Sequence, residues 1–155
     1  MAQEPIIEQQ AVHDADLYQA VVDAVEGLDI VRESRAPVSV TVESAVVTLT
    51  GVVISETMRR AVVYYAASVP GVRKVVDKLV EDPRLRSAVA SALAADPLTG
   101  PHQTSVTITS YLGMISLSGP ALPPDVQSRA KEVAASVPGV REVFAHFGVY
   151  QSGDA

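Results

Sequence analysis

The sequence predicts an α+β fold: two tandem αββαβ units, each a small mixed three-stranded sheet with two helices on one face. Two observations predict this fold, an internal repeat and the same order of hydrophobic patterns in each copy. The eight residues AASVPGVR at 66–73 recur unchanged at 134–141, an offset of 68 residues. The same offset aligns other motifs without a gap, so two copies of one unit are the simplest account of the chain.

Length and composition agree with two small units. The 155 residues are 48% hydrophobic, which is enough apolar surface for one ordinary domain or two small ones. The repeat divides them into a first copy at 14–81 and a second at 82–150, with a flexible tail at 1–13 and a short tail at 151–155. Because a unit of about 68 residues buries little surface alone, we expect the free face of each sheet to be covered by the other copy or by another chain.

Each copy opens with an amphipathic helix. Apolar residues recur at helical spacing: Leu17, Ala20, Val21, Ala24 and Leu28 in the first copy, and Leu85, Ala88, Val89, Ala92 and Leu93 in the second. Asp14 and Asp16 precede the first run, where an acidic side chain caps a helix or favours its N-terminal dipole.

A β-hairpin follows the opening helix in each copy. Residues 38–42 alternate with period two and are followed after a short turn by 46–51, which ends in glycine. Residues 106–109 and 114–119 repeat this pattern in the second copy. Alternation interrupted by a two- to three-residue turn is typical of paired antiparallel strands.

A second helix and a last strand complete each copy. The helix begins near Ser55 in the first copy and after 123–125 in the second, where proline suits the first turn. It ends at the Pro-Gly pairs, because proline lacks the donor that a continuing helix needs and glycine takes the turn. The last strands are expected at 72–80 and 140–150. A strand–helix–strand crossover is right-handed, which places both helices on one face of a mixed sheet.

The repeated glycines and prolines are interpreted as structural. A glycine that closes a strand accepts a turn or bulge conformation that other residues avoid, and a Pro-Gly pair stops a helix. The residues of this kind are Gly51, Pro70, Gly71, Gly119, Pro138 and Gly139.

Two of these motifs resemble the BON domain, a family named for bacterial osmotically induced and nodulation proteins. Its pattern V-x-L-[ST]-G reads here as 47–51 and, with Ile115 in place of valine, as 115–119, and its V-P-G-V reads as 69–72 and 137–140. The resemblance covers nearly the whole chain. It implies a periplasmic or envelope-associated protein that is linked to osmotic or envelope stress and contacts phospholipid surfaces.

No motif indicates catalysis. His13, His102 and His146 lie far apart without metal-ligand spacing, cysteine is absent, and neither a GxSxG motif nor a glycine-rich phosphate loop occurs. We therefore expect no enzyme activity, no cofactor and no metal. Glu81 and Asp82 are interpreted as a solvated boundary between the copies.

The overall charge excludes one class of partner. Twelve basic against eighteen acidic residues give a net charge of −6, the wrong sign for a protein that binds nucleic acid by neutralising phosphates. The N-terminal sequence has no basic region followed by an apolar run, and no segment has the roughly 18 uninterrupted apolar residues of a membrane span. As written, the sequence is expected to be cytoplasmic and to lack a transmembrane segment, whereas the family resemblance implies the envelope.

The second helix differs between the copies. In the second copy its outer face carries Lys131 and Glu132, but the equivalent residues of the first copy are Val63 and Tyr64. The expected core positions of the first-copy helix are Met58, Val62, Tyr65 and Val69. A helix that is apolar nearly all round is buried on two sides. It can pack against the other copy, a second subunit or lipid, and the sequence leaves these alternatives open.

A local excess of positive charge lies beside this helix. Between residues 59 and 86 there are seven basic residues, Arg59, Arg60, Arg73, Lys74, Lys78, Arg84 and Arg86, against three acidic ones. Apolar and basic groups together favour a lipid headgroup interface. Our leading hypothesis is a non-enzymatic protein that docks on anionic phospholipid, and the alternative is a module that forms homo-oligomers or polymers. The residues expected to form the lipid or partner interface are Arg59, Arg60, Val63, Tyr64, Ala67, Arg73 and Lys74.

Overall fold

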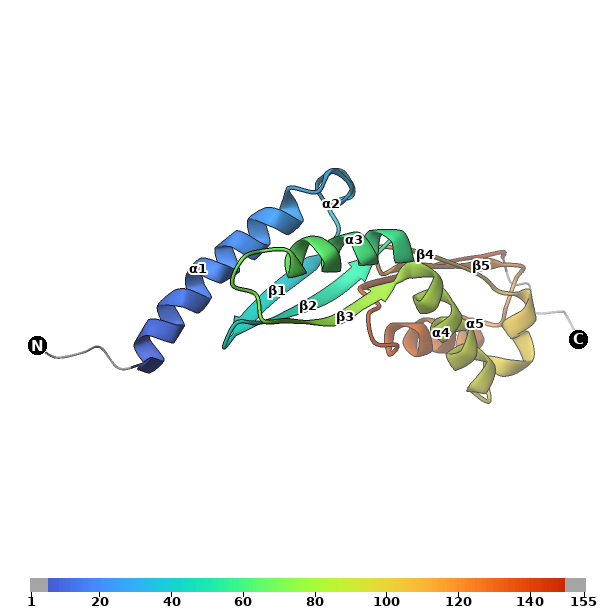
Figure 1. Cartoon of the computed structure of the whole chain (residues 1–155). Coiled ribbons are helices and arrows are strands. Elements are labelled where there is room, and N and C mark those ends of the chain that lie inside the picture. The colour runs from blue at the N-terminus through green and yellow to red at the C-terminus, as the bar shows by residue number, and fades with distance from the viewer. Residues whose placement is uncertain (1–5, 150–155) are drawn as a thin grey trace, which may run out of the picture. The chain divides into compact units, whose positions relative to one another are not determined.

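The computed structural model describes residues 6–149, with side chains from residue 13 onward. The chain divides into two compact units, 1–81 and 82–155 (Figure 1). The short tail expected at 151–155 and the final residue of the last strand lie outside the described residues. The first helix begins at Ile6, inside the segment that was expected to be a flexible tail.

The first unit contains three helices and a three-stranded sheet. Strand β2 is central, with β1 antiparallel on one side and β3 parallel on the other. Helices α1 and α3 contact each other and pack on this sheet. The elements are α1 (Ile6–Glu26), α2 (Asp29–Ser34), β1 (Val38–Glu43), β2 (Val46–Val53), α3 (Glu56–Ala67) and β3 (Lys74–Glu81).

The second unit repeats the same arrangement. Central β5 pairs with antiparallel β4 and parallel β6, and helices α4 and α5 contact each other and the sheet. Its elements are α4 (Asp82–Ala95), the 3₁₀ helix η1 (Gly100–Ser105), β4 (Thr107–Tyr111), β5 (Met114–Gly119), α5 (Pro124–Ala135) and β6 (Glu142–Phe147). The predicted fold of two mixed three-stranded αββαβ units is therefore confirmed.

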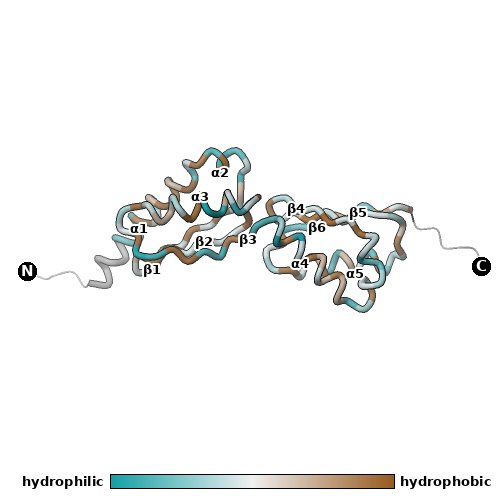
Figure 2. Tube along the Cα trace, turned by 45° about the vertical axis from the view of Figure 1, so that its right-hand side comes forward, coloured by the Kyte–Doolittle hydropathy of each residue, from teal (hydrophilic) through white to brown (hydrophobic). Residues whose placement is uncertain are grey.

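The core of each unit lies between its helices and one face of its sheet. Helical spacing of three to four residues and strand spacing of two bring apolar side chains into this layer, and Figure 2 shows the resulting alternation of hydrophobic and hydrophilic residues along the chain. The buried residues of the first unit include Leu17, Val21, Val25, Val47, Leu49, Met58, Val62 and Ala66. Those of the second include Leu85, Val89, Leu93, Ile115, Leu117, Val126, Ala130 and Val133.

One predicted core residue is wrong. Tyr65 is 47% exposed, and the fully buried position one residue later belongs to Ala66. Met58, Val62 and Ala66 follow one another at intervals of four residues and so lie on the same side of α3. Because α3 packs closely on the core at this point, the small side chain of Ala66 is buried there and the bulky one of Tyr65 is not.

Two aspartates act on the hairpins rather than as helix caps or solvated boundaries. Asp14 lies eight residues inside α1, and its carboxylate accepts hydrogen bonds from the amides of Ser44 at 2.8 Å and Ala45 at 2.9 Å. Asp82 accepts hydrogen bonds from the amides of Leu112 at 2.7 Å and Gly113 at 3.1 Å. The expectation that Glu81 and Asp82 form a solvated boundary is therefore wrong. Both residues are buried, and the carboxylate of Asp82 fastens α4 to the hairpin of its own unit.

Gly51, which lies inside β2, and Gly119, which ends β5, are needed for close approach to the backbone. Gly51 has a φ of +123°, and a Cβ atom there would lie 1.8 Å from the carbonyl oxygen of Pro37. Gly119 has a φ of +159°, and its Cβ would lie 2.5 Å from the carbonyl oxygen of Ser105. A side chain at either position would therefore collide with the backbone.

Candidate interaction surfaces

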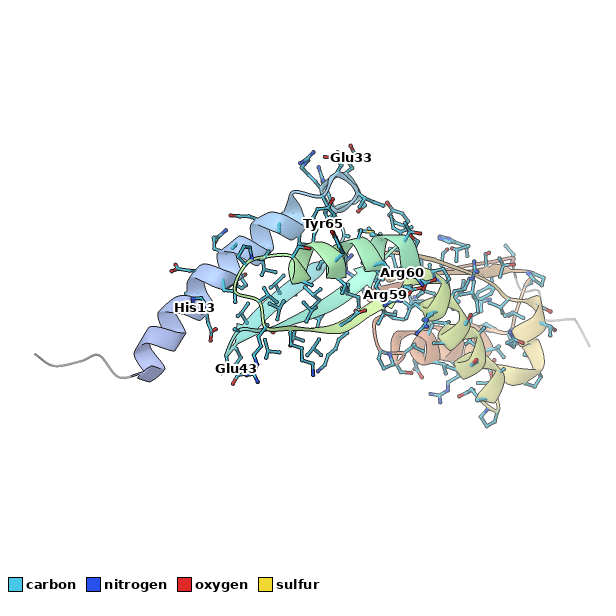
Figure 3. All side chains as sticks on the ribbon, viewed as in Figure 1. His13, Glu33, Glu43, Arg59, Arg60 and Tyr65 are labelled. Carbon is cyan, nitrogen blue, oxygen red and sulfur yellow. The ribbon has the colours of Figure 1, made fainter. Side chains whose placement is uncertain are left out.

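The outward side of α3 carries a pair of exposed tyrosines. Tyr64 is 67% and Tyr65 47% exposed, and their rings meet edge to face with centroids 5.4 Å apart. Arg60 and Ala67 are exposed one turn to either side of Tyr64 (Figure 3 labels Arg60 and Tyr65). We call these residues, Arg60, Tyr64, Tyr65 and Ala67, the α3 outer face.

Arg59 is engaged within its own unit. Its Nε donates to Glu81 Oε1 at 2.6 Å and its Nη1 to Asp77 Oδ2 at 2.7 Å, so one guanidinium joins α3 to β3 (Figure 3). The hydrogen bonds to Asp77 and then Glu81 raise the pKa of Arg59. Arg60 instead forms an exposed ion pair with Glu56 at 2.6 Å, one helical turn away. Such an exposed pair contributes little to stability and is readily exchanged for another partner.

The remaining predicted interface residues do not join the α3 outer face. Val63 is half-buried against the core of the first unit. Arg73 is exposed in the connection after α3, where its amide donates to the carbonyl oxygen of Ala45 at 2.9 Å. Lys74 pairs with Val46 in the sheet, and the alternation of strand side chains places it on the face away from the helices. The structure thus brings together Arg60, Tyr64 and Ala67, and separates them from Lys74.

Each sheet also has a face that its helices do not cover. Because Val47 and Leu49 point into the core, the alternate residues of β2 and their register partners point away from it. We call this the first open face: Ser39, Thr41, Glu43, Val46, Thr48, Thr50, Lys74, Val76 and Lys78. The equivalent second open face consists of Thr107, Thr109, Tyr111, Met114, Ser116, Ser118, Glu142, Phe144 and His146.

The second open face presents large apolar side chains to solvent. Tyr111 is 52%, Phe144 41% and Met114 37% exposed. Tyr111 pairs with Met114, and Phe144 lies on the neighbouring strand beside Ser116. Sequence reasoning missed this patch, although one signal was present: Tyr111 and Phe144 occupy the strand positions that alternate with core residues.

The first open face has different side chains at the same positions. Glu43, Val46 and Val76 replace Tyr111, Met114 and Phe144, and the ends of its β3 row are Lys74 and Lys78. A hollow of about 400 Å³ lies at the hairpin end of this sheet. Its lining includes Thr41, Glu43, Val46 and Thr48.

The described residues contain no cluster of three or more metal-ligating side chains. His13, His102 and His146 lie on α1, η1 and β6, respectively. Within 6–149, no helix is both long and apolar enough to cross a membrane.

Comparison with known proteins identifies the family. No curated protein sequence matches the chain. Two similar solved structures are of CdsD, a structural protein of the type III secretion system of Chlamydia trachomatis, one of them its C-terminal domain; both are 11% identical with a TM-score of 0.39. The alignments cover 83% and 84% of this chain and 92% and 98% of theirs. The family model of the BON domain matches residues 13–83 and again 81–149, so the chain belongs to the BON-domain family and carries two tandem copies of the domain.

Proposed function

We propose that this protein is a non-enzymatic binding module that docks on anionic phospholipid surfaces through the α3 outer face. The observation that carries the proposal is the exposed pair Tyr64 and Tyr65 beside Arg60. A tyrosine ring has an apolar body and a polar tip, which suits the boundary between acyl chains and headgroups. A well-placed arginine adds about 1 kcal/mol of attraction to an anionic membrane surface.

Arg60 is better suited to this role than Arg59. The Arg59 guanidinium already binds Asp77 and Glu81, whereas among the described residues Arg60 pairs with one exposed carboxylate, that of Glu56. Membership of the BON family supports contact with phospholipid and a role in osmotic or envelope stress, and we include that role in the proposal.

Vesicle co-sedimentation tests the proposal. We expect binding to vesicles that contain anionic lipid, little binding to purely zwitterionic vesicles, and loss of binding in the variant Arg60→Glu with Tyr64→Asp. The control is Lys131→Glu with Tyr18→Asp, which reverses an exposed cation on α5 and adds a carboxylate in place of an exposed tyrosine on α1, outside both open sheet faces. Equal binding to both vesicle types, or equal binding of variant and control, would refute the proposal.

A second candidate function is self-assembly. It is favoured by the two open sheet faces, of which the second exposes Tyr111, Met114 and Phe144. Exposed apolar patches rimmed by polar residues are typical of interaction sites. Light scattering over a concentration series tests this function, because a strict monomer at every concentration contradicts it.

A further inference from the structure

We propose that the first open face of one chain packs on the second open face of another copy, so that chains associate head to tail. This inference rests on the self-assembly function proposed above and names its interface. It is supported by the charges, the apolar side chains and the shapes of the two open faces, compared at equivalent positions of the repeat.

The two open faces have opposite charge. The first carries Lys74, Lys78 and Glu43, which gives a net charge of +1 from two lysines and one glutamate. The second carries Glu142, which gives a formal charge of −1 when histidine is counted as neutral. Lys74 and Glu142 occupy equivalent positions in the repeat. Pairing two first faces would set lysines against lysines, so charge favours a first face against a second one.

The apolar groups and the shape are also complementary. The second open face supplies the protruding side chains Tyr111 and Phe144, and the first supplies the hollow of about 400 Å³ beside Val46. Lysine stems pack well over aromatic rings, and their ammonium groups interact favourably with the ring faces. Lys74 and Lys78 flank the half-buried Val76 on their strand, so this row offers two lysine stems and an apolar side chain to the aromatic rings of the second open face.

The contact joins different surfaces of identical chains. After the contact forms, one chain still has its second open face unused and the other still has its first open face unused. A heterologous contact of this kind propagates unless its rotation closes a ring. We therefore expect assemblies larger than dimers at high concentration.

Charge reversal with complementation tests the interface. Sedimentation equilibrium of the full chain is expected to show a mass that rises with concentration. The variants Lys74→Glu with Lys78→Glu, and Glu142→Lys, should each weaken association at least about tenfold, because like charges then face each other. An equimolar mixture of the two variants should assemble again, since both contacts along the mixed chain become complementary. The control variants Lys131→Glu and Glu33→Lys, at exposed positions on helices, should assemble as the unmodified chain does.

Other results overturn the proposal in distinguishable ways. A monomer at every concentration overturns both self-assembly and this interface. Two outcomes overturn this interface but leave self-assembly standing. In the first, the charge-reversal variants associate as strongly as the unmodified chain. In the second, association stops at a dimer, and only the variant Phe144→Ser abolishes that dimer. A mixture of variants that does not assemble also overturns it, provided that circular dichroism shows both variants folded. The vesicle variant Arg60→Glu with Tyr64→Asp should assemble normally, so failure of lipid binding has no bearing on the outcome.

Discussion

Asp14 and Asp82, at equivalent positions of the repeat, hold equivalent hairpin turns in the two units. Asp14 binds the amides of Ser44 and Ala45, and Asp82 binds those of Leu112 and Gly113. All four turn residues have positive φ angles, the conformation of a tight type I′ hairpin turn. The amides of such a turn point outward together, so one carboxylate can accept both and fasten the first helix of the unit to its sheet.

Removing either carboxylate should destabilise its unit. We expect Asp82→Ala to lower the free energy of unfolding by about 1.5–3 kcal/mol, because it leaves two buried amides without their charged acceptor. Asp14→Ala should cost less, since Ser44 is exposed and water can replace the carboxylate there. Urea denaturation measures both values. Asp16→Ala, an exposed change on the same helix as Asp14, is the control and should cost less than Asp14→Ala.

The second unit should lose stability in acid through Asp96. The hydrogen bond from Arg129 Nε, 2.8 Å from Asp96 Oδ2, lowers the pKa of this carboxyl, and the amides of Thr99 and Leu98 lower it further. An aspartate with a lowered folded-state pKa stabilises the fold above its unfolded pKa of about 3.9, and this contribution disappears as the pH falls through the folded value. Arg129→Met should therefore reduce the difference between denaturation midpoints at pH 7 and in strong acid. An unchanged pH dependence in this variant contradicts the assignment.

Two neighbouring residues of α3 should respond differently to charge. Val63→Lys should lower the free energy of unfolding by about 1 kcal/mol, because it replaces a half-buried valine that packs on the core. Tyr64→Glu should change it by no more than about 0.5 kcal/mol, as expected for an exposed side chain. Chemical denaturation of the two single variants measures the difference. Equal effects would mean that Val63 does not pack as described.

Replacing Gly51 by alanine should lower the free energy of unfolding far more than replacing Gly71. Both have positive φ angles, +123° and +98°. An alanine at 71 meets its nearest neighbour at an ordinary 3.5 Å, but at 51 it collides with the backbone of Pro37. We expect Gly71→Ala to cost about 1 kcal/mol of unfolding free energy from backbone strain alone, and Gly51→Ala at least about 2 kcal/mol more through the added collision. Thermal denaturation of the two variants provides the comparison, and similar melting temperatures would contradict the prediction.

The repeat, the order of the elements and most of the core can be predicted from the amino-acid sequence. These follow from local rules, because a period of 3.6 or 2 shows which side of a helix or strand is apolar without reference to the rest of the chain. Periodicity does not distinguish neighbouring residues of similar polarity. Tyr65 and Ala66 are both apolar, and the closeness of α3 to the core decides which of them is buried. The short helices α2 and η1 span too few residues to produce a periodic signal.

The partners of the polar side chains depend on tertiary contacts. From the sequence, Arg59 is one member of a basic cluster. In the fold, strand β3 places Asp77 and Glu81, which lie 18 and 22 residues further along the chain, within hydrogen-bonding distance of its guanidinium. From the sequence, Asp14 is expected to cap a helix. In the fold, its carboxylate instead accepts hydrogen bonds from the amides of Ser44 and Ala45 in the hairpin turn. In the sequence, Lys74 lies close to α3. In the fold, its pairing with Val46 places it on the face of the sheet away from the helices. Local periodicity does not encode such partners, because a hydrogen bond or ion pair between distant residues depends on the path of the chain between them.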